Sequence, residues 1–101
     1  MTQSLTGIDA LRAERSALVA EAEALLARSR ARPAMEQAIA LYGRAEQLAR
    51  EEQLRLLATL KSRTTPRALG ANSWVEFVAG QLAVSHDDAR LMLRDIDALG
   101  P

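Results

Sequence analysis

Apolar residues recur every three or four positions over two long stretches of the chain, about residues 8–31 and 34–62. Residues with this spacing share one face of an α-helix, so the pattern predicts two long helices. Thr6 precedes the first stretch and Asp9 follows three residues later, which predicts a capping box at the start of that helix. Pro33 separates the stretches, and so short a joint forces the two helices into an antiparallel hairpin.

The helical pattern is interrupted at residues 63–72, where Pro66, a glycine and two threonines indicate a linker. Two shorter helices are expected beyond it, within residues 73–101, and Ser85 is placed to cap the second of them. The sequence therefore predicts an all-α fold: a long antiparallel helical hairpin over residues 1–62, followed by a small helix-turn-helix unit. We expect the parts to form one compact domain overall, because the chain has only 101 residues.

The segment 74–96 fits the helix-turn-helix template. Ala79 inside the first helix and Ala83 at the turn are small, which allows the two helices to cross closely. Asn72 or Ser73 is expected to cap the first helix. This template indicates an architecture, and it does not by itself indicate that the unit binds DNA.

Composition and charge limit the kinds of function that the sequence indicates. Alanine and leucine dominate the apolar residues, as is typical of helical proteins, and the net charge is zero. That neutral total divides into a net charge of +3 on residues 1–69 and −3 on residues 70–101. A strongly electrostatic binder of nucleic acid or of an anionic membrane is therefore not indicated.

Two arginines on the last helix carry the alternative hypothesis, a dimeric helix-turn-helix regulator that binds DNA. Arg90 and Arg94 lie four positions apart and could contact phosphates or guanine edges. The same helix begins with Asp87 and Asp88, which DNA phosphates would repel. We therefore disfavour DNA binding, and we expect the arginines to pair with acids on their own helix, such as Asp87 or Asp97.

A second apolar face on the helix over residues 34–62 suggests self-association. The main apolar stripe of this helix, which runs from Met35 through Ile39 to Leu60, is expected to face inward, and Leu41, Leu54 and Leu57 lie on a second face. The hairpin is too thin to bury both faces. These leucines are expected to face water, and exposed stripes of this kind mark partner sites. We expect a two-fold dimer through the second helices. The full candidate partner surface comprises Leu41, Leu54, Leu57, Trp74, Asp87, Asp88, Arg90 and Arg94.

No enzyme signature is present in the sequence. There is no Gly-rich phosphate loop, nucleophile elbow or HExxH motif. With no cysteine and one histidine, we expect no catalytic residue, no cofactor and no metal site. The acid pairs Glu21/Glu23 and Glu51/Glu52 are interpreted as solvated charge. No leader peptide and no apolar run of about 20 residues is visible, so we expect a cytoplasmic protein without membrane contact.

Two resemblances add to these expectations. Residues 35–45 resemble the second helix of a tetratricopeptide repeat, although only one copy is present.

Residues 40–100 resemble the N-terminal helical domain, of unknown function, of the actinobacterial repeat family often fused to HNH endonucleases. The positions that carry this resemblance are Ser73, Trp74, Ala79, Leu82, Val84, Ser85, Ala89, Arg90, Leu93 and Arg94. No HNH segment follows, so nuclease activity is not expected, and the resemblance implies a stand-alone accessory domain. The function predicted is a non-catalytic helical adaptor or regulatory module that acts through protein–protein interaction and self-association, with an unknown protein partner.

Overall fold

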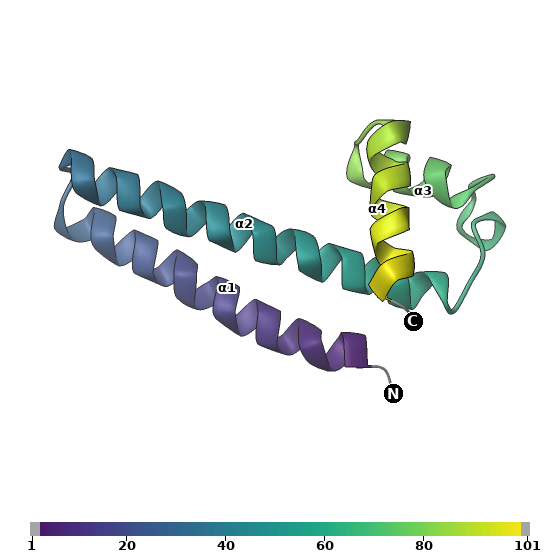
Figure 1. Ribbon diagram of the computed structural model, residues 1–101, viewed down its shortest axis with the longest axis horizontal. Coiled ribbons are helices and arrows are strands. Elements are labelled where there is room, and N and C mark those ends of the chain that lie inside the picture. Colours follow the sequence, from purple (N-terminus) through teal and green to yellow (C-terminus); the bar gives the residue numbers. More distant parts are fainter. Residues whose placement is uncertain (1–2, 100–101) are drawn as a thin grey trace. The chain divides into compact units, whose positions relative to one another are not determined.

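The computed structural model describes residues 3–99 and is all-α over that range (Figure 1). Its helices are α1 (Gln3–Arg28), α2 (Arg32–Lys61), the 3₁₀ turn η1 (Arg67–Leu69), α3 (Trp74–Leu82) and α4 (His86–Leu99). The described residues contain no strand. The predicted fold class is confirmed: α1 and α2 form a long antiparallel hairpin, and two shorter helices follow.

The two long helices begin earlier than the sequence pattern suggested. α1 already includes Gln3, so Thr6 lies within the helix and the predicted capping box at Thr6 is wrong. α2 begins at Arg32, which places Pro33 in its first turn, where a missing amide costs no hydrogen bond. The joint between the helices is stabilised by Ser29, whose Oγ accepts a hydrogen bond from the amide of Ala31 at 3.1 Å.

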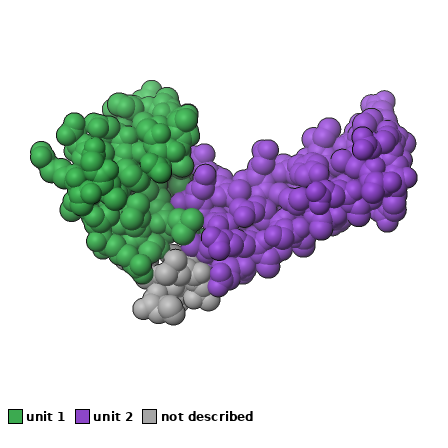
Figure 2. Space-filling model, turned by 180° about the vertical axis from the view of Figure 1, so that it is seen from behind, with its two compact units in different colours: residues 1–5, 54–101 green, residues 6–53 purple. Residues whose placement is uncertain are grey.

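The chain divides into two compact units, coloured separately in Figure 2. We call residues 6–53 the hairpin unit, and residues 54–101 together with 1–5 the C-terminal unit. The sequence pattern placed the boundary in a linker at 63–72 and expected one compact domain overall, whereas the division falls inside α2. The physical reason is that the last two turns of α2 contribute side chains to the core of the C-terminal unit.

The C-terminal unit has a well-packed apolar core. Val78 of α3 and Met92 of α4 are completely buried at its centre. The core comprises Leu57, Ala58, Val78, Ala89, Met92 and Ile96, and partly buried apolar side chains surround it. At its edge, Nζ of Lys61 at the end of α2 lies 2.9 Å from a carboxylate oxygen of Asp97 on α4. Three helices thus supply one core.

Both short helices begin at a serine cap. Oγ of Ser73 accepts a hydrogen bond from the amide of Glu76 at 3.1 Å, and Oγ of Ser85 accepts one from the amide of Asp88 at 3.0 Å. These bonds satisfy amides that have no partner within their own helix. Between the helices, Ala83 adopts a left-handed conformation with φ of 54°, which reverses the chain after α3. The predicted caps and turn are confirmed.

The predicted linker at 63–72 is a folded loop that contains η1. The turn ends at Gly70, whose φ of 82° lies in the region that favours glycine. The amide of Gly70 donates to the carbonyl of Arg67 at 3.0 Å, and the amide of Ala71 donates to the carbonyl of Pro66 at 2.9 Å. These backbone hydrogen bonds give the segment a defined path.

The hairpin unit has a thin core, in which half of the described buried residues are alanine. Its buried side chains are Ile8, Ala22, Ala38, Ala45, Leu48 and Glu52. Alanines at the contact let the two helix backbones approach closely, but they bury little apolar area. Larger apolar residues such as Leu18, Leu26 and Tyr42 are only partly buried. Two helices therefore leave part of the apolar surface of this unit uncovered.

Candidate functional site

The most exposed large apolar side chain of the chain's described part lies on α2. Ile39 is 71% exposed, and Met35, one turn earlier, is 43% exposed. Residues four apart on an α-helix lie on the same face, so these two side chains are neighbours on the surface. A single exposed apolar residue is ordinary, whereas two adjacent ones on a helix with a thin core make this face a candidate binding surface.

Three further residues continue this face in both directions. Gly43 lies one turn beyond Ile39, and Arg32 and Glu46 lie seven positions before and after it, or about two turns away. All five side-chain positions are exposed. We call Arg32, Met35, Ile39, Gly43 and Glu46 the outer strip. It is apolar at its centre, with a basic residue at one end and an acidic residue at the other.

Gly43 is an unusual residue for the interior of a long helix. Glycine there costs about 1 kcal/mol relative to alanine, because its backbone is freer in the unfolded chain. A Cβ placed on Gly43 would meet no described atom within 4 Å, apart from its own helix backbone and chain neighbours. Packing within the described chain therefore does not require a glycine at this position.

The charged ends of the outer strip differ in their partners. Nε of Arg32 lies 3.3 Å from a carboxylate oxygen of Glu36, one turn further along the helix, and both side chains are largely exposed. Such an exposed pair contributes little to stability and exchanges readily with other partners. Glu46 forms no ion pair with any residue that the structure describes. Both charges are accessible.

The three leucines that were predicted to be exposed differ in how deeply they are buried. Leu57 is buried in the core of the C-terminal unit, and Leu54 packs against that core. Leu41 is half-buried. The expectation that these three leucines face water is therefore wrong for Leu57 and holds only partly for the others. α2 is apolar on both faces, and the rotation of α2 against its neighbours turned Ile39 outward, although the sequence pattern had placed it inward.

The remaining predicted surface residues belong to the C-terminal unit. Nη1 of Arg90 lies 2.9 Å from a carboxylate oxygen of Asp87, which confirms the predicted pairing for Arg90. Asp97, the other predicted partner on α4, is paired with Lys61 of α2 instead. Asp88 and Arg94 are exposed. Trp74 is half-buried and meets Phe77 edge-on, with ring centroids 5.7 Å apart. Of the predicted partner surface, the structure thus brings Asp87 and Arg90 together. Leu41, by contrast, lies in the hairpin unit.

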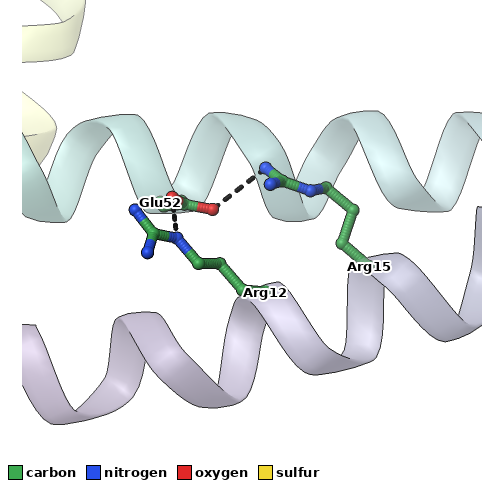
Figure 3. A network of polar contacts seen from close by, with 3 residues as sticks. All are labelled: Arg12, Arg15 and Glu52. Carbon is green, nitrogen blue, oxygen red and sulfur yellow. Dashed lines mark hydrogen bonds and ion pairs between the residues drawn. The ribbon is translucent and has the colours of Figure 1, made fainter.

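A charge network crosses the hairpin at Glu52 (Figure 3). Nε of Arg12 donates a hydrogen bond of 2.7 Å to Oε2 of Glu52, and Nη1 of Arg15 lies 2.9 Å from Oε1. Glu52 is only 7% exposed, so the interpretation of Glu51/Glu52 as solvated charge is wrong for Glu52. The signal was present in the sequence, because Glu52 follows Leu48 by one turn and Ala45 by two on the inner face.

The network favours the charged form of Arg12. Its hydrogen bond to Glu52, reinforced by attraction to the Glu52 charge, raises the pKa of Arg12 above the ordinary arginine value. Oε1 of Glu52 receives no hydrogen bond from the described residues and is balanced by the charge of Arg15. Two arginines therefore face one buried carboxylate across the hairpin.

Other kinds of site find little support in the described residues. They contain no group of three or more histidine, aspartate or glutamate side chains arranged to hold a metal ion. None of the helices within residues 3–99 is long and apolar enough to span a bilayer. The chain matches no protein-family model, no curated protein and no solved structure. The outer strip carries the most exposed large apolar side chain among the described residues.

Proposed function

We propose that this chain is a non-catalytic helical adaptor or regulatory module that binds proteins through helical surfaces and associates with itself. The observation that carries the proposal is the exposure of Ile39, 71%, beside Met35 on α2. An isoleucine side chain that remains in water forgoes the free energy of burial, about 1.5–3 kcal/mol. A partner that covers both residues recovers that free energy.

The thin core of the hairpin unit supports the same proposal. Alanines fill half of its described buried positions, and its larger apolar side chains are mostly covered only in part. A second hairpin packed against this one would form a bundle of four helices and cover these side chains.

The test is sedimentation equilibrium of the purified chain from about 1 to 100 μM. We expect a mass that rises with concentration, and Ile39→Glu should weaken association by at least about tenfold, because it places a charge in an apolar contact. Ala40→Glu is the matched control, since Ala40 is also exposed on α2 but lies off the outer strip. A chain that stays monomeric at 100 μM would overturn self-association.

A further inference from the structure

The outer strip is complementary to itself when two copies run antiparallel. If a two-fold axis passes beside Ile39, each residue n positions after Ile39 faces the residue n positions before it on the other copy. Ile39 then meets Ile39 of the second copy, and Met35 faces Gly43. The basic end, Arg32, faces the acidic end, Glu46.

The side chains that face each other in this register are complementary at each of the three contacts. The two exposed isoleucines bury each other at the centre. The flexible Met35 side chain lies over Gly43, where the absence of a side chain lets the helices approach closely, as the open space around that glycine allows. Arg32 and Glu46 form opposite-charge pairs, and the symmetry supplies two of them. A parallel pair of α2 helices would instead place Arg32 beside Arg32 and Glu46 beside Glu46.

We propose that the partner of the outer strip is a second copy of this chain, bound antiparallel with Ile39 at the two-fold axis. This inference rests on the proposed self-association and adds the surface and the register. It also gives Gly43 a role, because nothing within the described chain requires a glycine there. Arg32 exchanges its weak contact with Glu36 for the carboxylate of Glu46 on the other copy.

Disulfide trapping tests the register directly, because the chain has no cysteine of its own. A disulfide needs Cα atoms within about 7 Å of each other. We expect Ile39→Cys to form a disulfide dimer alone, and Met35→Cys to form one only when mixed with Gly43→Cys. In the antiparallel register, the two Met35 positions lie about 12 Å apart along the helix axis. Gln37→Cys, which is exposed on the opposite side of α2, is the control.

Charge exchange provides an independent test that leaves Ile39 intact. Arg32→Glu and Glu46→Arg should each weaken the dimer about tenfold, because each creates two pairs of like charges. The double variant Arg32→Glu/Glu46→Arg restores opposite charges and should return the dissociation constant to within about threefold of the original. Circular dichroism at 222 nm checks that each variant remains helical.

Gly43→Ala separates a binding role from helix stability. At a concentration where the chain is monomeric, the alanine should raise the unfolding temperature, because it favours the helix. At higher concentration it should weaken the dimer, because its methyl group stands where Met35 packs. A glycine without a role in binding would give the higher unfolding temperature with an unchanged dissociation constant.

The outcomes distinguish the two proposals. If the chain is monomeric at 100 μM, self-association and the register both fail. If it is dimeric but Met35→Cys cross-links to itself, or the charge exchange gives no rescue, the register is wrong while self-association stands. Mixed cross-linking of Met35→Cys with Gly43→Cys, together with rescue by the double variant, supports the antiparallel dimer.

Discussion

Glu52 on α2 accepts a hydrogen bond of 2.7 Å from Arg12 on α1, forty positions earlier in the chain. The carboxylate is buried, whereas the guanidinium is about half exposed. A buried carboxylate without its partners would be costly, so this pair favours the one alignment of the two helices that brings Arg12 and Arg15 to Glu52. In a hairpin whose buried apolar side chains are mainly alanine, the network supplies specificity that apolar packing provides only weakly.

Replacing Glu52 with glutamine tests this role. Glu52→Gln keeps the shape of the side chain but removes the charge that Arg12 and Arg15 neutralise. We expect the free energy of unfolding to fall by about 1–3 kcal/mol, as measured by urea denaturation. Glu23→Gln is the control, because Glu23 is exposed on α1 and should change stability by less than about 0.5 kcal/mol. Equal effects of the two substitutions would contradict a specific role for Glu52.

The arginine side of the network should not make stability depend on pH near neutrality. The pKa of Arg12 is raised in the folded chain, so its contribution is fully present below the ordinary arginine pKa. That contribution is lost only as the pH rises through the raised value, far into the alkaline range. The difference in unfolding temperature between the original chain and Arg12→Met should therefore be the same at pH 7 and pH 9. A difference that shrinks by pH 9 would contradict this assignment.

The core of the C-terminal unit depends on Met92. This side chain is completely buried, so Met92→Ala should leave a cavity and lower the free energy of unfolding by about 2–5 kcal/mol. Trp74 is the chain's one tryptophan and lies in the same unit, so its fluorescence reports that transition. Leu91→Ala is the control, because Leu91 is 47% exposed. A small effect of Met92→Ala would mean that the core collapses around the cavity.

Serine caps and interior serines should respond oppositely to alanine. Ser85→Ala removes the acceptor for the amide of Asp88 and should cost about 1 kcal/mol. Ser16→Ala, at an exposed position inside α1, removes no hydrogen bond to a described residue and should be neutral or slightly stabilising, because alanine is the better helix former. Thermal unfolding followed by circular dichroism measures both. Destabilisation by Ser16→Ala would contradict the distinction.

Glycine substitutions should also differ in sign. Ala83 has a φ of 54°, which strains any residue with a Cβ, so Ala83→Gly should be neutral or should stabilise the chain by up to about 1 kcal/mol. Ala24→Gly, at an exposed site within α1, should instead destabilise it by about 1 kcal/mol. Urea denaturation followed by circular dichroism distinguishes the two outcomes. A clear loss of stability in Ala83→Gly would mean that the alanine methyl group contributes more than the strain costs.

Binding to DNA is expected to be absent. The first turn of α4 carries Asp87 and Asp88, and the guanidinium of Arg90 is already paired with Asp87. Fluorescence anisotropy of a labelled mixed-sequence duplex at low salt should show no binding at micromolar protein concentration. Binding that weakens steeply with added salt would favour the DNA-binding regulator. In that case, the double variant Arg90→Ala/Arg94→Ala should abolish the signal.

The sequence by itself determined the local features of this protein. Helical spacing predicted the hairpin and the two short helices, and Ser73, Ala83 and Ser85 marked the caps and the turn of the C-terminal unit. Such features depend on residues within a few positions of one another, so a sequence pattern contains the information that defines them. The pairing of Arg90 with Asp87 within one helix was predictable for the same reason.

Only the tertiary structure decided which side chains are buried. α2 is apolar on two faces, and the rotation of α2 against its neighbours buries Leu57 and exposes Ile39. Glu52 is neutralised by arginines that are distant in sequence, so its burial depends on the alignment of α1 with α2. The division into units likewise falls inside α2, because the end of that helix supplies part of another core. These outcomes follow from packing between elements, which the spacing within one helix does not specify.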